Sequence, residues 1–559
     1  KRLALVAARK SQDLHQFAQA FLPEYETRKQ QRGWLDFDDL ILNARQLLND
    51  PAVAAWVLYR LDGGIDHILV DEAQDTSPVQ WDVIEKLAQE FTAGIGARSD
   101  VERTIFVVGD KKQSIYSFQG ADPDAFDRMQ IEFANRLSES GSGLQNAALE
   151  FSFRSSAAIL KLVDLVFKDS PRAGFHSDAL HRAFKSDLPG RVDLWPAIDK
   201  TDEDDDSDWT DPVDRPGSRH HTVILAERIA RQIKEMIDNK VTIPEDGPSR
   251  GTFQRRPVHA GDFLILVQRR SELFSEIIRA CKNAELPIAG ADRLKVGAEL
   301  AVKDIAALLS FLATPEDSLA LAEVLKSPLF GWSEQMLFDL AHRRSSKHLW
   351  PALRDRREDF AETLAVLDDL RDQTDFLRPF DLIERILTRH QGRQKLLGRL
   401  GPEAEDGINA LLSQALAYER SDIPSLTGFL VWMQTDDLEI KRQMGASGDM
   451  IRVMSVHGSK GLEAPIVILP DTAKRNAPSD AEIMVADGTP LWKLPKDQMP
   501  DLLFSAREAA QEKQQNERLR LLYVALTRAE KWLIVATAGT LSKEGDSWYQ
   551  RVEAALHDG

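Results

Sequence analysis

HILVDEAQD, residues 67–75, places a short apolar run directly before an acidic pair, Asp71 and Glu72. Short, uniformly apolar runs that stop at polar residues are typical of strands buried on both faces of a parallel sheet. Comparable runs recur at 104–108, 263–267, 451–454, 466–469 and 532–536. Stretches with helical spacing separate most of these runs, so the chain is predicted to be an α/β protein.

The long segment 298–440 breaks this alternation, because its apolar residues keep helical spacing throughout. The simplest architecture is two α/β domains with this helical block inserted into the second. We expect the block to move relative to its host, because interfaces between parts of one chain are commonly modest and polar. Helices are also expected at 11–33, 40–48 and 222–239. Loops are expected in the acidic run 202–214 and in the proline- and glycine-rich segment 244–257.

The composition is that of a globular chain, with 559 residues, 43% of them hydrophobic and 29% charged. The single cysteine, Cys281, excludes an intrachain disulfide and a cysteine-based metal cluster, and it fits a reducing compartment. No apolar run is long enough to cross a bilayer, so we expect no membrane partner. The formal net charge of −18 argues against a generally basic nucleic-acid-binding surface but not against a local basic groove.

An acidic pair at the end of a buried strand is suited to metal-assisted phosphate chemistry. The first carboxylate, Asp71, can hold Mg²⁺, and the second, Glu72, can take a proton from an attacking water. A sheet fixes both groups at its carboxyl edge. Taken alone, the same pair is more often the N-cap of a helix, so this signal needs a second element.

The second element follows the run at 104–108, where residues 107–121 read VVGDKKQSIYSFQGA. This stretch combines a glycine turn with the amide of Gln113, which could sense a terminal phosphate. It also places Tyr116 and Phe118 near lysines, and exposed aromatic rings beside cations can stack on nucleic-acid bases. The alternative is that both rings are buried against the sheet.

These two segments resemble motifs II and III of the UvrD/Rep class of superfamily I DNA helicases. Further segments resemble other motifs of that class, in the same order along the chain. They are 34–41 (WLDFDDLI) upstream of motif II, 151–156 (FSFRSS) for motif IV, 455–463 (SVHGSKGLE) for motif V and 521–530 (LLYVALTRAE) for motif VI. The resemblance covers about residues 34–540, and the stretches 117–121 (SFQGA) and 325–330 (LKSPLF) are most similar to the AddA/RecB branch, within it to AddA.

The resemblance implies two RecA-like domains of the P-loop NTPase type that use ATP and Mg²⁺. The residues it places at the nucleotide are Asp71 at Mg²⁺, Glu72 at the attacking water, Gln113 at the γ-phosphate, Arg154 and Arg528 as arginine fingers, Gly461, and Glu463 at the sugar. The residues it places at single-stranded DNA are Tyr116, Phe118, Ser455 and His457. A zinc role for His457 is rejected, because no His or Cys stands at metal-ligand spacing from it.

The family pattern also predicts the division of the chain. Residues 1–150 would be the remainder of the first motor domain (1A/1B), and 151–297 the first part of the second RecA-like domain (2A). Residues 298–440 would be the helical insertion (2B), and 441–559 the remainder of 2A. Single-stranded and duplex-end DNA, an AddB-type partner subunit, 3′–5′ polarity, double-strand break repair and the bacterial cytoplasm are further implications of the resemblance.

The chain departs from the family pattern in two respects. Gln119 stands where an arginine is common in motif III, which weakens any charge role there. More seriously, a P-loop needs a Gly-Lys dipeptide, and the sequence contains none. We therefore expect the chain to begin inside the first motor domain, and to lack the nuclease domain that follows motif VI in AddA. The stretch 290–295 faintly resembles a nuclease motif but precedes motif V, and it is interpreted as a loop.

Two other hypotheses remain open at this stage. The chain could be a non-catalytic DNA-binding scaffold subunit that lacks a P-loop, or an unrelated nucleotide-binding α/β protein. A scaffold has no physical need to keep all the nucleotide-contacting residues, and this chain keeps them. An unrelated protein does not explain the motif IV to VI segments alongside motifs II and III.

Overall fold

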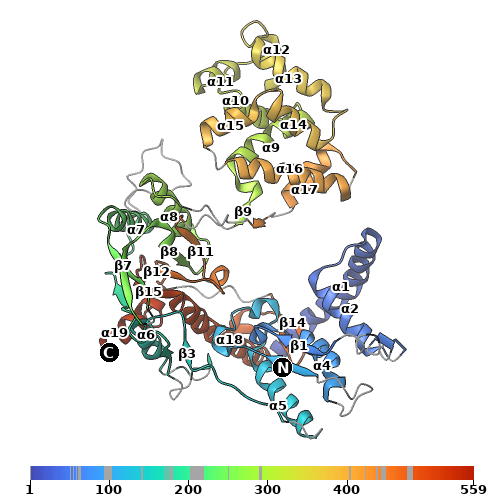
Figure 1. The fold of residues 1–559 in the computed structure, drawn as a ribbon. Helices are drawn as coiled ribbons and strands as arrows, with labels where there is room; N and C mark the ends of the chain where they lie inside the picture. The colour runs from blue at the N-terminus through green and yellow to red at the C-terminus, as the bar shows by residue number, and fades with distance from the viewer. Residues whose placement is uncertain are drawn as a thin grey trace. The chain divides into compact units, whose positions relative to one another are not determined.

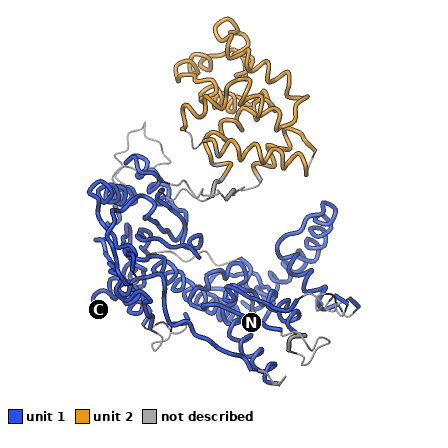
Figure 2. Tube along the Cα trace, in the orientation of Figure 1, with its two compact units in different colours: residues 1–288, 449–559 blue, residues 289–448 orange. Residues whose placement is uncertain are grey.

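A computed structural model gives the structure of the chain from residue 2 to residue 558. The residues it does not describe within that range are 51, 54–55, 58–59, 61–64, 93–102, 140–142, 169, 171–172, 176–179, 202–219, 250, 289–292, 402–403, 422, 436–438, 442–448 and 475–481. The acidic run 202–214 therefore lies outside the described residues. The chain divides into two compact units, residues 1–288 with 449–559 and residues 289–448 (Figure 2).

The first unit begins with two helices, α1 (Arg2–Arg32) and α2 (Phe37–Asn49). The helix expected at 11–33 thus starts earlier than predicted. Asp36 caps α2 by accepting a hydrogen bond from the amide of Asp39, and the Asp39 side chain accepts one from the amide of Asp36. Such a reciprocal pair satisfies amides that have no partner within the helix.

A small parallel sheet follows, made of β1 (His67–Val70) and β2 (Thr104–Val107), with Val70 opposite Val107. Two helices, α4 (Pro78–Thr92) and α5 (Pro123–Glu139), pack on one face through Trp81, Met129 and Phe133. The side chains of the other face are open, with Leu69 74% and Phe106 60% exposed. Parallel strands are normally covered on both faces. Among the described residues, this sheet is covered on one face only.

A larger parallel sheet forms the second half of the first unit, in the strand order β11-β8-β12-β15-β5. Of these strands, Figure 1 labels β8, β11, β12 and β15. The strand bounds are β5 Arg191–Leu194, β8 Phe263–Val267, β11 Arg452–Ser455, β12 Ala464–Leu469 and β15 Ala529–Val535. The helices around it are α6 Ala157–Phe167, α7 His221–Asp238, α8 Glu272–Asn283, α18 Asp501–Leu526 and α19 Trp548–Asp558. The strands predicted from apolar runs are confirmed, and all five residues of β8 are buried.

The strands on either side of the helical block lie next to each other in this sheet. β8 precedes the block and β11 follows it, and the two pair in parallel with Val453 opposite Ile265. The chain therefore leaves this sheet after β8, forms the helical block, and returns to the sheet at the adjacent strand β11.

The segment 244–257 was expected to be a loop, and the structure shows that this prediction is wrong. It forms most of an antiparallel hairpin, β6 (Thr242–Asp246) and β7 (Phe253–Pro257). Pro244 and Pro257 are tolerated because the hairpin has only two strands, so every strand is an edge. Other two-stranded pairs are β3 Phe151–Ser152 with β4 Arg182–Ala183, and β13 Ile483–Ala486 with β14 Thr489–Trp492.

The second unit is helical, as predicted, around one apolar core that includes Phe311, Leu353 and Phe429. Its helices are α9 Leu300–Ala313, α10 Ser318–Lys326, α11 Glu334–Ala341, α12 Leu349–Asp355, α13 Ala361–Gln373, α14 Pro379–Thr388, α15 Gly392–Leu400, α16 Ala404–Ser421 and α17 Leu426–Thr435. Part of the stretch interpreted as a loop, β9 (Arg293–Lys295), instead pairs antiparallel with β10 (Glu439–Lys441). Among the described residues, no helix combines the length and apolarity that crossing a membrane requires.

Candidate functional site

The predicted acidic pair lies at the carboxyl end of β1, with both residues exposed. Glu72 has a φ of 52°, in the left-handed region that few residues other than glycine adopt. It precedes the short 3-10 helix Ala73–Asp75, but its side chain makes no capping hydrogen bond. The N-cap alternative therefore does not account for this pair. The Glu72 side chain is 53% exposed, so its carboxylate is accessible to a ligand or a water molecule.

Gln74 ties the two predicted motifs together from a fully buried position. Its amide nitrogen donates to Glu72 Oε2 at 2.5 Å, and its amide oxygen accepts from the backbone N of Asp110 at 2.9 Å. A Cβ at Gly109 would lie 2.7 Å from that same oxygen, so only glycine allows this approach. The orientation of Glu72 is thus set by the loop that follows β2.

Gln113 ends the short 3-10 helix Lys111–Gln113 in that loop. Its side-chain amide donates to Asp110 Oδ2 at 2.9 Å, and Asp110 Oδ1 also accepts from the backbone N of Lys112 at 3.0 Å. Asp110 therefore fixes the loop and holds the Gln113 amide in place. The paired strands β1 and β2 end next to each other, with Asp71 and Glu72 after β1 and Gln113 in the loop after β2.

Lys460, which the sequence reasoning did not assign, connects the loops of the small sheet with motif V. Its ammonium pairs with Asp75, lies 3.1 Å from Glu72 Oε2 and donates to the backbone oxygen of Gln113 at 3.1 Å. Burial raises the pKa of Asp75, while Lys460 opposes that shift. The signal that could have found Lys460 is its place between Ser459 and Gly461 inside the motif V segment.

Further contacts cross the same seam between the small sheet and the large one. The Arg520 guanidinium of α18 is buried and donates to the Ser114 backbone oxygen at 2.7 Å. The backbone N of Ser117 donates to Glu517 Oε1 at 3.0 Å. Helix α18, which ends in motif VI, is therefore bonded directly to the loop that carries Gln113.

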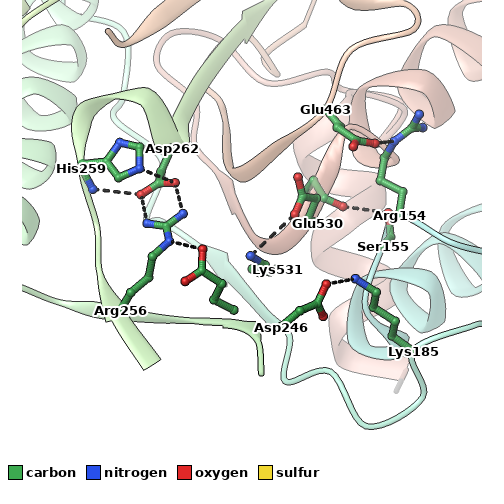
Figure 3. A network of polar contacts seen from close by, with 12 residues as sticks. Arg154, Ser155, Lys185, Asp246, Arg256, His259, Asp262, Glu463, Glu530 and Lys531 are labelled. Atoms are coloured by element: carbon green, nitrogen blue, oxygen red, sulfur yellow. Dashed lines mark hydrogen bonds and ion pairs between the residues drawn. The ribbon is translucent and has the colours of Figure 1, made fainter. Parts of the chain in front are cut away.

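Arg154 lies at the start of the second α/β half, where its Nε donates to Glu463 Oε2 at 2.5 Å (Figure 3). Both residues line a cavity of about 720 Å³ together with Phe153, Lys185 and Asp246. At this cavity the Lys185 ammonium donates to Asp246 Oδ2 at 2.6 Å. Asp246 is the last residue of the hairpin strand β6. Phe153 is a second residue that the sequence reasoning missed. Its exposed ring beside Arg154 and Glu463 is suited to contact a flat base.

Arg528 is almost completely buried, with 1% of its surface exposed. Its Nε donates to the Val524 backbone oxygen at 3.0 Å, and one terminal nitrogen donates to the Leu462 backbone oxygen at 3.1 Å. Burial and the positive charge of Arg154 together lower the pKa of Arg528 to about 10. Within the part of the chain that the structure describes, no carboxylate is bonded to Arg528. This edge of the large sheet therefore carries positive charge that a phosphate group could neutralise.

Gly461 lies in the motif V loop with a φ of 82°, again in the left-handed region. A side chain there would be strained, so glycine is required for this turn between Lys460 and Glu463. The turn places Lys460 toward the small sheet and Glu463 toward Arg154.

The residues predicted at DNA gather on the motif III and motif V loops. The Tyr116 hydroxyl donates to the His457 backbone oxygen at 3.2 Å, and the Phe118 and His457 rings are 5.7 Å apart in an edge-on arrangement. Phe118 is 68% exposed, whereas Tyr116 is partly buried under the Lys460 ammonium, 5.4 Å from its ring. Ser455 Oγ accepts from the Gly458 backbone N at 3.3 Å and holds the loop. The alternative in which both rings are buried therefore fails for Phe118.

The side chains present fit the implied ligands, ATP and Mg²⁺. Arg528 offers a buried positive charge, and the cavity at Arg154 and Glu463 is large enough for the sugar and base of a nucleotide. Asp71 and Glu72 offer exposed carboxylate oxygens, and Mg²⁺ is commonly bound by one or two carboxylates together with substrate phosphates. Among the described residues, no group of three or more His, Cys, Asp or Glu side chains could hold a metal alone. A nucleotide-dependent Mg²⁺ site at Asp71 fits this arrangement.

Comparisons with known proteins agree with this arrangement of segments. The model of the UvrD/REP helicase N-terminal domain matches residues 2–134. The model of the UvrD-like helicase C-terminal domain matches residues 226–540, which is more than half of the chain.

Similar proteins are named as a subunit of an ATP-dependent helicase/nuclease. The one from Listeria monocytogenes (serotype 4b, strain F2365) is 26% identical over 564 residues, covering 96% of this chain and 44% of that protein. Those from Oceanobacillus iheyensis and Geobacillus thermodenitrificans are each 26% identical, over 590 and 576 residues, covering 97% and 94% of this chain and 46% and 44% of those proteins. The chain thus spans less than half the length of these relatives. With the C-terminal domain model matching more than half of its residues, the chain belongs to the UvrD-like helicase family.

Proposed function

We propose that the chain is the motor portion of an AddA-like, ATP-dependent 3′–5′ DNA helicase that acts in double-strand break repair and recombination. The observation that carries this proposal is the seam between the two sheets. There Lys460 of motif V contacts Asp75, Glu72 and the backbone of Gln113. A change at the phosphate-contacting loops can therefore be transmitted to the second α/β half through one side chain.

The proposed division of the chain follows the family pattern. Residues 1–150 are the remainder of the first motor domain, and 151–297 with 441–559 form the second RecA-like domain. Residues 298–440 are its helical insertion, which we propose moves relative to its host. The pairing of β8 with β11 supports the insertion.

The proposed chemistry is phosphoryl transfer from ATP to water, in which bound Mg²⁺ neutralises phosphate charge. Asp71 holds the metal ion, Glu72 takes the proton of the attacking water, and the Gln113 amide bonds the terminal phosphate. Arg154 and Arg528 stabilise the negative charge that develops there. Gly461 shapes the loop that carries Glu463, which bonds the sugar hydroxyls. Phe153 stacks on the base.

The proposed substrate is DNA with a single-stranded or duplex end, held in part by Tyr116, Phe118, Ser455 and His457. The relatives are named as one subunit of a helicase/nuclease, which supports an AddB-type partner. The proposed location is the bacterial cytoplasm. A non-catalytic scaffold protein is the second candidate, and the absence of a Gly-Lys dipeptide favours it.

We further propose that a phosphate-binding loop from outside residues 1–559 completes the nucleotide site. The extended form denotes the protein that includes this loop. The experiment that tests the proposed function is DNA-stimulated ATP hydrolysis by the extended form and its loss in Glu72→Gln. The scaffold alternative predicts that the full-length protein has no such loop and binds DNA without hydrolysing ATP.

Alanine at Phe118 or Tyr116 is expected to weaken binding of single-stranded DNA. Stacking of a base on an aromatic ring contributes about 1–3 kcal/mol, so each variant should raise Kd by about fivefold or more. The change is measured by fluorescence anisotropy with an oligothymidine at fixed salt. Phe376→Ala, which removes an exposed ring from the helical unit, is the control for Phe118→Ala and should leave Kd unchanged. Equal affinities for Phe118→Ala and Phe376→Ala would contradict the assignment.

A further inference from the structure

A chain of hydrogen bonds runs through the second α/β half and ends at the motif VI helix. His181 Nδ1 lies 2.6 Å from Asp164 Oδ1 on α6, and His181 Nε2 lies 3.0 Å from the Tyr523 hydroxyl on α18. The backbone N of His181 also donates to Asp164, at 3.2 Å from Oδ2. All three side chains are largely shielded from solvent. None of the roles assigned above uses Asp164, His181 or Tyr523.

With Asp164 ionised, the carboxylate can only accept, so the Nδ1 that faces it donates the proton. With the ring neutral, Nε2 accepts from the Tyr523 hydroxyl. Burial raises the pKa of Tyr523, and the negative charge of Asp110 raises it further, so this hydroxyl keeps the proton that it donates.

Tyr523 lies between the loop that carries Gln113 and the turn that carries Arg528. The Lys112 ammonium, from the loop that carries Gln113, is 5.7 Å from the centre of the Tyr523 ring. On the other side, the Tyr523 backbone oxygen accepts from the Thr527 backbone N at 3.0 Å and from Thr527 Oγ1 at 2.8 Å. Arg528 is the next residue along the chain. The Tyr523 ring therefore lies beside the motif III loop, and its backbone is bonded to the turn that carries Arg528.

We propose that Asp164 and His181 are positioning residues that fix Tyr523 and, through it, hold Arg528 and the loop of Gln113 in the arrangement needed for ATP hydrolysis. This inference rests on the proposed function, because it assigns Arg528 a part in that reaction. Neither residue touches the reacting atoms. Small displacements of a catalytic group reduce turnover strongly, and this gives a residue outside the site a measurable effect.

The test uses His181→Phe, Tyr523→Phe and the double variant of the extended form. Each single variant is expected to lower kcat for ATP about tenfold, with KM changed by less than about twofold. The double variant is expected to lose no more than the singles, because both break the same chain of bonds. His181→Gln, whose amide can donate to Asp164 and accept from Tyr523, should restore most of the turnover.

A readout without nucleotide tests the same inference on residues 1–559. Hydrogen exchange at the amide of Thr527 should be about tenfold faster in His181→Phe than in the unaltered chain. His390→Phe is the matched control, because it removes a histidine that bonds Asp369 at 2.7 Å with similar burial in the helical unit. It should change neither the exchange rate nor kcat.

Several results would overturn the inference. One is a lower Tm in His181→Phe with kcat and Thr527 exchange unchanged, which means that the bonds serve stability only. Another is a kcat loss in the double variant equal to the product of the two single losses. If instead Glu72→Gln leaves ATP hydrolysis intact, the proposed function fails and this inference with it. An unchanged kcat in His181→Phe overturns this inference alone.

Discussion

Replacing Arg528 with lysine is expected to lower kcat for DNA-stimulated ATP hydrolysis by the extended form about a thousandfold. The guanidinium donates to the Val524 and Leu462 backbone oxygens, and these two bonds fix the orientation of its planar group. A lysine cannot make both bonds and still reach a phosphate, because its ammonium is a single point charge. Initial rates at saturating ATP and single-stranded DNA measure the effect.

Arg256→Lys is the matched control for this prediction. Arg256 also makes a two-point contact, with Asp262 at 2.5 and 2.7 Å, but it lies in the β6–β7 hairpin. Its replacement should lower Tm modestly and leave kcat unchanged. Similar kcat values for Arg528→Lys and the unaltered extended form would show that Arg528 is a structural residue.

Residues 1–559 alone are expected to hydrolyse ATP no faster than the solvent background. The catalytic groups stabilise charge on a phosphate that must first be held in line, and positioning supplies most of phosphoryl-transfer catalysis. The sequence contains no Gly-Lys dipeptide to hold the phosphates. The small sheet that carries Asp71 is also open on the face of Leu69 and Phe106.

The measurement compares phosphate release by residues 1–559 and by the extended form, each with and without single-stranded DNA. Weak binding of single-stranded DNA by the short chain should survive, because Phe118 and His457 both lie within it. Turnover by the short chain that matches the extended form and disappears in Glu72→Gln would show that other residues bind the phosphates.

The inner strands β8 and β12 of the large sheet could be predicted because burial on both faces leaves no polar positions in them. Phe263–Val267 is the clearest case, with every residue apolar and buried. The hairpin at Pro244 and Pro257 could not be predicted, because proline and glycine signals are the same in a loop and in an exposed two-stranded ribbon. Edge strands can accommodate proline, and sequence alone does not reveal an edge.

The candidate site was predictable only as far as its local motifs extended. Asp71 and Glu72 could be found because they follow a strand, and Gln113 because it follows a glycine turn. The role of Lys460 depends on Asp75, which lies 385 residues away in the chain, and the pairing of His181 with Tyr523 spans 342 residues. Such pairs are set by the packing of the two sheets, and no local pattern contains that information. Nor does the motif around Arg528 indicate that its side chain is buried.

The central claim is that the carboxylates of the small sheet and the arginines of the large sheet form one ATP-hydrolysing site. The most direct measurement is ATP hydrolysis by the extended form of the unaltered protein and of Glu72→Gln, with single-stranded DNA present and absent. The account predicts DNA-stimulated hydrolysis that falls by about 10²–10⁴-fold in Glu72→Gln, with the Kd for single-stranded DNA unchanged. Hydrolysis that persists in Glu72→Gln, or an extended form that binds DNA and never hydrolyses ATP, would contradict it.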